Sequence, residues 1–276
     1  MKYEKRQLKI RFALLVILVA ILGILLILFA LFCRDGNYNE VEITTETTTE
    51  ESTTEPITEE PTSTPEESTT EAETTTKPPV KWDNYNPIDV LNSENWATTL
   101  ISKKYPLGKT YSPTLAPVID GSSVTADTRV ADAYKLMYAD ALKEGLVLTP
   151  YSAYCSYSRQ QTNYENKVQA FVLQGMTEDE AKANAEKRIE PAGCSENGAG
   201  LSVDIVSASA GFSSTDEYKW LVNNAHKYGF ILRYPEDKTD VTGIIYQPWH
   251  WRYVGIEVAN EMKSNNLCLE EYLGVI

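Results

Sequence analysis

The pattern of apolar and polar positions divides the chain into three segments. Residues 12–33 read FALLVILVAILGILLILFALFC, a run of 22 residues without a charge. A helix rises about 1.5 Å per residue, so this run can cross a hydrocarbon core of about 30 Å. Residues 36–80 are nearly devoid of apolar side chains, and periodic apolar positions begin only after residue 81. The pattern predicts one transmembrane helix, a linker and one folded domain at 81–276.

Within 81–276 the apolar positions alternate between helical and strand-like periods. Thr128–Leu142 has a helical apolar face that ends before a glycine. Capping-box patterns predict a helix that begins at Thr177 and runs to about Arg188, and another that begins at Ser214 and ends at Gly229. Three short apolar stretches, 201–206, 230–234 and 249–254, predict strands. The order favours an α+β domain in which helices pack on a small antiparallel sheet.

Basic residues give the apolar segment a direction. Lys2, Lys5, Arg6, Lys9 and Arg11 precede it, and such a flank stays in the cytoplasm. We therefore expect residues 1–35 to form a short cytoplasmic tail and a single-pass membrane helix, with the rest of the chain extracellular. A cleaved signal peptide is the alternative, but the apolar run is longer than the usual 7 to 15 residues or so. A lipoprotein would need a small residue before Cys33, where Phe32 stands.

Charge and composition characterise the middle segment. Residues 36–80 hold twelve Glu against one Lys, among many Thr, Ser and Pro. Such a segment cannot bury enough apolar surface to offset the entropy of ordering, so we expect a disordered, extended linker. The net charge of the whole chain is −14, which argues against a nucleic-acid partner.

Several motifs between residues 100 and 273 resemble the VanY-type D-alanyl-D-alanine carboxypeptidases, zinc peptidases related to the lysostaphin and hedgehog domains. The motifs are SAYCSYSRQ (152–160), GCSENGAGLSVD (193–204), WLVNNAHKYGFILRYP (220–235) and QPWHWRYVG (247–255). The resemblance implies the fold of that group. It also implies a zinc ion held by His, Asp and His, a Glu general base and an Arg that holds the end of the peptide substrate.

Three of these five family roles fall on substituted residues. Asp204 and His250 match two metal ligands, but the first His ligand falls on Asn197. The general base falls on Gln247 and the Arg on Cys155. An amide is a poor zinc ligand beside imidazole, and Gln does not accept a proton near neutral pH. Cys lacks the forked positive charge that binds a carboxylate. We therefore expect no bound cofactor, although zinc is the cofactor of the family.

The cysteines leave two interpretations open. Cys155 and Cys194 lie in two motifs that converge on the site in the family, so an extracellular disulfide between them is the simpler interpretation. A rebuilt metal site is the other, in which one of these thiolates joins Asp204 and His250. Cys268 is expected to be a buried structural thiol. His226, the second histidine, is expected to lie at a helix end.

Other positions of the family site are retained. They are Gln160, Ser195, Tyr234 and Trp249. The resemblance implies that they line the cleft that receives the peptide end, while a purely structural role is the alternative, because aromatic residues often fill cores.

Three functions are compatible with this sequence. The first is a membrane-anchored pseudo-peptidase at the bacterial cell wall that binds peptidoglycan stem peptides or a cell-wall protein. The second is an active zinc carboxypeptidase that uses a rebuilt, cysteine-containing site. The third is a protein-interaction module in which the cleft has no role. Likeness of fold alone does not establish activity, so the site has to distinguish them.

Overall fold

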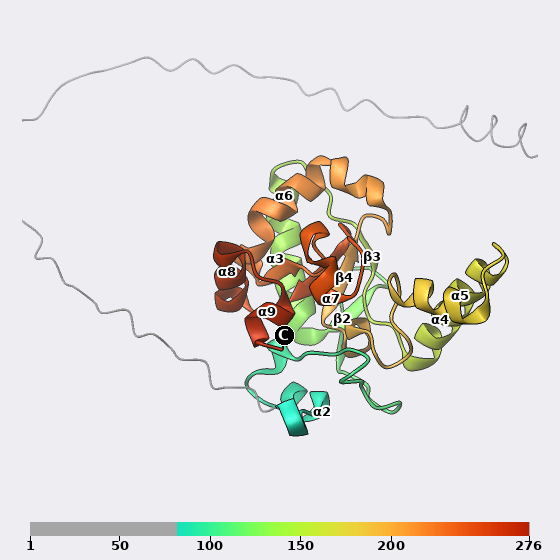
Figure 1. Ribbon diagram of the computed structural model, residues 1–276. Helices are drawn as coiled ribbons and strands as arrows, with labels where there is room; N and C mark the ends of the chain where they lie inside the picture. The colour runs from blue at the N-terminus through green and yellow to red at the C-terminus, as the bar shows by residue number, and fades with distance from the viewer. Residues whose placement is uncertain (1–81, 276) are drawn as a thin grey trace, which may run out of the picture. The chain divides into compact units, whose positions relative to one another are not determined.

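The computed structural model describes residues 82–275, which form an α+β domain (Figure 1). Its centre is a four-stranded antiparallel sheet with the strand order β3-β4-β6-β5. The strands are β3 (Pro150–Ser152), β4 (Ser202–Ile205), β5 (Phe230–Leu232) and β6 (His250–Tyr253). The predicted strands at 201–206, 230–234 and 249–254 are thus confirmed, each slightly shorter than expected.

The register of the two central strands places the candidate site on one face of the sheet. Asp204 of β4 lies opposite His250 of β6, and Ser202 lies opposite Arg252. Neighbours along a strand point to opposite faces, so these four polar residues share one face. Val203 and Trp251, paired with each other between them, belong to the buried core on the other face.

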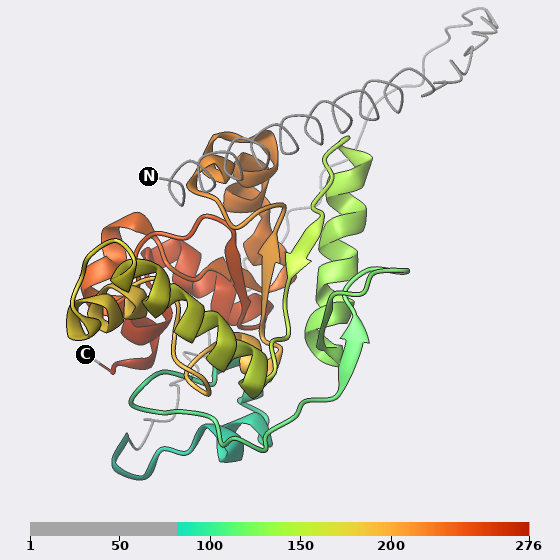
Figure 2. The same cartoon turned by 90° about the vertical axis from the view of Figure 1, so that its right-hand side faces the viewer.

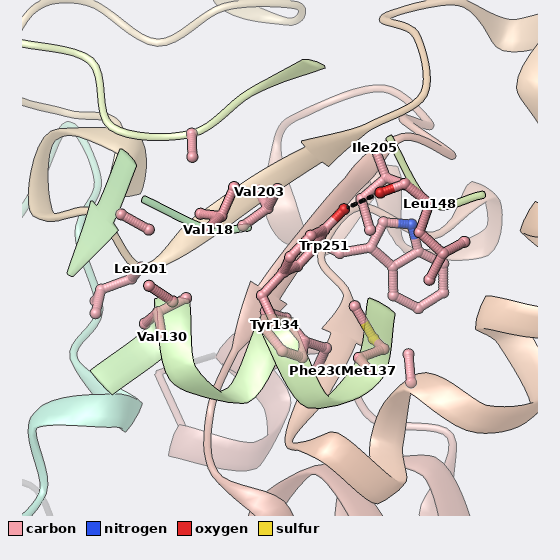
Figure 3. Packing of buried hydrophobic residues seen from close by; sticks show 14 of the residues in the cluster. Val118, Val130, Tyr134, Met137, Leu148, Leu201, Val203, Ile205, Phe230 and Trp251 are labelled. Carbon is pink, nitrogen blue, oxygen red and sulfur yellow. Dashed lines mark hydrogen bonds between the residues drawn. The ribbon is translucent and has the colours of Figure 1, made fainter. Parts of the chain in front are cut away.

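Helix α3 (Thr128–Lys143) packs against that core face (Figure 3). Its fully buried residues include Val130, Tyr134 and Met137. The hydroxyl of Tyr134 donates a hydrogen bond of 2.6 Å to the carbonyl of Leu148, which satisfies the only polar atom of this buried side chain. The prediction of an amphipathic helix at 128–142 is confirmed, and Asp127 caps its first turn.

Helices α4 (Tyr157–Val172) and α5 (Glu178–Glu186) form a hairpin that projects from the domain in Figure 1 and faces the viewer in Figure 2. Gln160 is the only buried residue of α4. The predicted capping box of α5 is present, with Thr177 and Glu180 exchanging hydrogen bonds. Apolar residues of α4 recur at helical spacing and are half-buried: Tyr164, Val168, Phe171 and Val172.

The C-terminal helices build a second, smaller core with the N-terminal part of the domain. Leu100 and Tyr105 pack there with Met262 of α8 (Ile256–Asn265) and Leu269 of α9 (Leu269–Leu273). The remaining elements are short: η1 (Trp82–Asn84), α2 (Pro87–Leu91), η2 (Trp96–Thr98), β1 (Leu115–Pro117), β2 (Thr125–Asp127), η3 (Glu196–Ala199), η4 (Ala210–Ser214), α6 (Asp216–Asn224), η5 (Ala225–Tyr228), η6 (Glu236–Lys238) and α7 (Thr239–Thr242).

One predicted helix start is off by a single residue. The cap of α6 is Thr215, whose hydroxyl accepts from the amide of Tyr218. The expected cap, Ser214, instead closes the preceding turn η4. The predicted stop at Gly229 is confirmed, because this residue ends η5 with a positive φ of 85°.

The predicted membrane helix at 12–33 and the predicted linker at 36–80 lie outside the described residues. Between residues 82 and 275 no helix is long and apolar enough to span a membrane.

Gly200 gives a test of how tightly the η3 turn is held. Its φ is +68°, and an added Cβ would lie 2.5 Å from the backbone nitrogen of Asp127. Since neither backbone can move freely, we expect Gly200→Ala to lower the free energy of unfolding by about 3 kcal/mol or more. Chemical denaturation measures this loss.

Gly121→Ala is the matched control for this substitution. Gly121 has a similar φ of +76° but nothing within 4 Å of the added Cβ, so only the backbone cost of about 1 kcal/mol is expected. Equal losses for the two variants would contradict the close packing of the turn.

Candidate functional site

A single cleft collects most of the residues that the sequence motifs point to. It has a volume of about 410 Å³ and lies beside β4, β6, the η3 turn and the α4–α5 hairpin. Its lining includes Cys155, Gln160, Ser195, Asn197, Asp204, Gln247, Trp249 and His250. Tyr234 and Cys194 line a neighbouring cavity instead. His226 lies in η5 and lines a separate cavity.

Asn197 stands at the position of the first metal ligand of the family, and its side-chain amide forms hydrogen bonds within the fold. Its Nδ2 donates to the carbonyl of Ala153 at 2.9 Å. Its Oδ1 accepts from the hydroxyl of Ser202 at 2.9 Å and from that of Ser195 at 3.4 Å. The side chain is 8% exposed, and it ties the η3 turn to β4 and to the residue that follows β3. Its amide oxygen is therefore already used.

His250 is held between two carboxylates. Its Nδ1 lies 2.8 Å from Oδ1 of Asp204, and its Nε2 lies 3.2 Å from Oε1 of Glu196. Burial alone favours the neutral imidazole, but hydrogen bonds to both carboxylates outweigh it and raise the pKa of His250 to about 10. At neutral pH His250 is therefore a charged imidazolium that donates through both ring nitrogens.

Glu196 connects His250 to two buried arginines. Its Oε2 accepts from Nη1 of Arg252 at 2.6 Å and from Nε of Arg233 at 3.1 Å. Burial would raise the pKa of Glu196, but the two guanidinium groups and His250 hold it well below its usual range. Arg233 also forms a two-pronged ion pair with Glu270 of α9, at 2.9 and 2.6 Å.

The formal charges of this network cancel. Three carboxylates, Asp204, Glu196 and Glu270, face three cations, His250, Arg252 and Arg233. Buried charges are tolerated when they are paired in this way. A proton on His250 is needed for the balance.

Sequence reasoning missed Glu196, Arg233, Arg252 and Glu270. A signal was present in the sequence. Arg233 lies inside the predicted strand 230–234, and Arg252 lies inside the predicted strand 249–254. A charged residue inside a buried strand requires a partner of opposite charge.

Gln247, at the position of the family base, donates through Nε2 to the carbonyl of Arg188 at 3.0 Å. A carboxylate has no proton to donate, so this bond is specific to the amide. Gln247 is 7% exposed, and its side chain joins the segment before β6 to the end of the α4–α5 hairpin.

The expected disulfide between Cys155 and Cys194 is not present, because both residues are free thiols in the structure. Sγ of Cys155 contacts Nδ2 of Asn163 at 3.9 Å, while Sγ of Cys194 contacts the carbonyl of Ala192. Burial raises the pKa of both thiols, which disfavours the thiolate that a nucleophile or a metal ligand needs. Cys268 is a buried free thiol, as predicted.

Two of the retained residues organise Glu190 at the edge of the cleft. Nε2 of Gln160 donates to the backbone carbonyl of Glu190 at 2.6 Å, and the hydroxyl of Tyr234 donates to its carboxylate. The Tyr234 ring also stacks on His250, with ring centroids 5.2 Å apart. Tyr234 therefore positions His250 from the second cavity, whereas Trp249 lines the cleft itself.

The residues present do not fit a zinc ion. Zinc sites use His, Cys and carboxylate ligands in sets of at least three. Over residues 82–275 no group of three or more such side chains is placed to hold a metal. Asn197 uses its amide within the fold, and His250 has no free ring nitrogen.

The fold and the sequence resemble proteins of known activity. A D-alanyl-D-alanine carboxypeptidase of Enterococcus faecalis is 35% identical over 182 residues, which cover 66% of this chain and 67% of the relative. The solved structure of VanYB in complex with D-alanine-D-alanine has a TM-score of 0.59 and 36% identity, and covers 65% of this chain and 98% of VanYB. The solved structure of a VanY variant in complex with Zn(II), from a VanB-type resistance cassette, has a TM-score of 0.58 and 36% identity. The match covers 64% of this chain and 99% of the VanY variant.

The family comparison agrees with these relatives. The model of the VanY family, described as D-alanyl-D-alanine carboxypeptidase, matches residues 123–256. This range contains the cleft residues from Ser152 to His250. The resemblance expected from the sequence motifs is therefore confirmed, and the chain belongs to the VanY family of D-alanyl-D-alanine carboxypeptidases.

Proposed function

We propose that this chain is a non-catalytic member of its family that binds peptidoglycan peptides ending in D-alanine. The observation that carries the proposal is the state of His250, whose two ring nitrogens are held by Asp204 and Glu196 at 2.8 and 3.2 Å. A protonated imidazole cannot ligate a metal, because both ring nitrogens carry a proton and no in-plane lone pair is left. In this chain a proton bound between two carboxylates takes the place that a metal has in the family.

The persistence of the cleft supports a binding role. A volume of about 410 Å³ suits a short peptide end, and the walls combine Trp249 with several polar side chains. VanYB has been solved with D-alanine-D-alanine bound, which suggests the ligand class for this chain. With neither a general base at Gln247 nor an arginine at Cys155, binding is not followed by hydrolysis.

Two other functions are less well supported. A rebuilt zinc site with Cys155 requires a thiolate, and burial raises the pKa of that thiol. A protein-interaction module that ignores the cleft would not account for the retained cleft residues. We propose in addition that the apolar segment 12–33 anchors the chain in a cell membrane, with residues 36–80 extending the domain towards the cell wall.

Binding and turnover together test the proposal. The purified full chain should retain peptides ending in D-Ala-D-Ala and sediment with isolated peptidoglycan. It should release no D-alanine, with or without added Zn²⁺. Release of D-alanine that a chelator abolishes and Zn²⁺ restores would show a working metallopeptidase instead.

Trp249→Ala distinguishes cleft binding from binding elsewhere. The variant should weaken retention of the peptide, because Trp249 lines the cleft. Tyr151→Ala is the control, since Tyr151 is an aromatic residue that is 59% exposed and lines a different cavity. Equal retention by the wild type and both variants would place the peptide-binding site outside the cleft.

Restoring the family residues should restore the family chemistry. The triple variant Asn197→His, Gln247→Glu and Cys155→Arg supplies the third ligand, the base and the cation. With a third ligand present, zinc can displace the proton on His250, so we expect the variant to bind about one zinc per chain and to release D-alanine at a measurable rate. Metal analysis and amino-acid detection measure both. Gln247→Glu alone is the control and should do neither, and a folded triple variant without zinc would mean that the site is misplaced.

The charge on His250 predicts the pH dependence of stability. Its pKa is about 10 in the folded protein against a reference of 6.5. A raised pKa adds stability that is complete below pH 6.5 and is lost as the pH rises towards 10. The free energy of unfolding should fall by up to about 1.4 kcal/mol per pH unit over this window.

His250→Gln separates this effect from other titrating groups. The introduced amide is neutral at every pH, so the difference in unfolding free energy between the wild type and His250→Gln should shrink as the pH rises. Denaturant titrations at several pH values measure this difference. A constant difference would contradict the imidazolium.

A further inference from the structure

Besides His250, the cleft carries four charged side chains, and they differ in how well they are paired. The acidic ones are Asp204 and Glu190, and the basic ones are Lys167 and Arg188. Asp204 is paired with His250. Glu190 accepts a hydrogen bond from the hydroxyl of Tyr234.

The two cations have no acidic partner among the described residues. Lys167 lies on α4, and its ammonium group has no hydrogen bond or ion pair within residues 82–275. Arg188 follows α5, and its guanidinium donates, within the described residues, only to the backbone carbonyl of Asn184, at 3.0 Å. Its guanidinium lies 5.3 Å from the ring centre of Phe171 of α4, a contact that leaves donors of its fork free.

Both cations belong to the α4–α5 hairpin, which forms one wall of the cleft. The opposite wall has no free positive charge, because His250 is held by two carboxylates and Cys155 stands where the family has an arginine. An unpaired Lys and Arg on one wall attract a carboxylate, and Arg binds it with directional hydrogen bonds.

We propose that Lys167 and Arg188 bind the C-terminal carboxylate of the peptide ligand, which therefore lies against the α4–α5 hairpin. The proposal rests on the proposed function. It adds a specificity, because the cleft would then prefer a free carboxylate to an amide at the peptide end. It also explains how binding survives without a cation at position 155.

The test compares two probes on the full chain by isothermal titration calorimetry. They are diacetyl-Lys-D-Ala-D-Ala and the same peptide with a C-terminal amide. We expect the acid to bind more tightly than the amide. Lys167→Gln and Arg188→Gln should each weaken binding of the acid about three- to fivefold, leave the amide unaffected and reduce the effect of added salt.

Two control variants remove a positive charge from the α4–α5 hairpin but outside the cleft, so they test whether the position of the charge matters. Lys182→Gln removes a lysine of α5 that is paired with Glu178 and does not line the cleft. Arg159→Gln removes an exposed arginine of α4 that lines a different cavity. Both should bind the acid as the wild type does.

The outcomes separate this inference from the proposed function. Equal binding of acid and amide, or wild-type binding by Lys167→Gln and Arg188→Gln, would overturn the role of the hairpin while the proposed function stands. If Lys182→Gln and Arg159→Gln weakened binding of the acid equally, net charge alone would explain the effect, and the role of Lys167 and Arg188 would also be overturned. Absence of binding to either peptide would overturn both.

Discussion

The structure of the site depends on one buried carboxylate. Glu196 is 1% exposed and contacts three cationic groups, at 2.6 Å (Arg252), 3.1 Å (Arg233) and 3.2 Å (His250). A buried carboxylate of this kind is tolerated only because the surrounding charges compensate its loss of hydration. The orientation of His250, the packing of α9 through Glu270 and the position of the η3 turn all follow from this arrangement.

The same arrangement explains how the site can persist with substituted residues. Asn197 and Gln247 each donate a hydrogen bond from the side-chain amide to a backbone carbonyl nearby. These hydrogen bonds fix the η3 turn and the end of the α4–α5 hairpin. The cleft therefore keeps its shape through interactions of the chain itself.

Sequence patterns predicted those parts of the fold that bury an apolar face. Helix α3 and strands β4 and β6 have regular apolar positions, and the motifs around Asp204 and His250 placed these two residues together. Helix α4 was not predicted, although Tyr164, Val168 and Phe171 recur at helical spacing, because the other residues of the segment are mostly polar. The partners of Glu196 could not be deduced either, since they come from residues far apart in the chain. The free thiols of Cys155 and Cys194 depend on local geometry that spacing does not reveal.

The contacts of Arg252 extend beyond the site. Besides Glu196, its guanidinium binds the backbone carbonyls of Ala97 and Thr99, at 2.8 and 2.9 Å, near the start of the described domain. Arg233 pairs with Glu196 and also with Glu270, which lies near the C-terminal end of the described domain. Segments near both ends of the described domain are therefore linked to Glu196, one through Arg252 and the other through Arg233. A mechanical load applied near Ala97 would pass through Arg252 directly into strand β6, to which this arginine belongs.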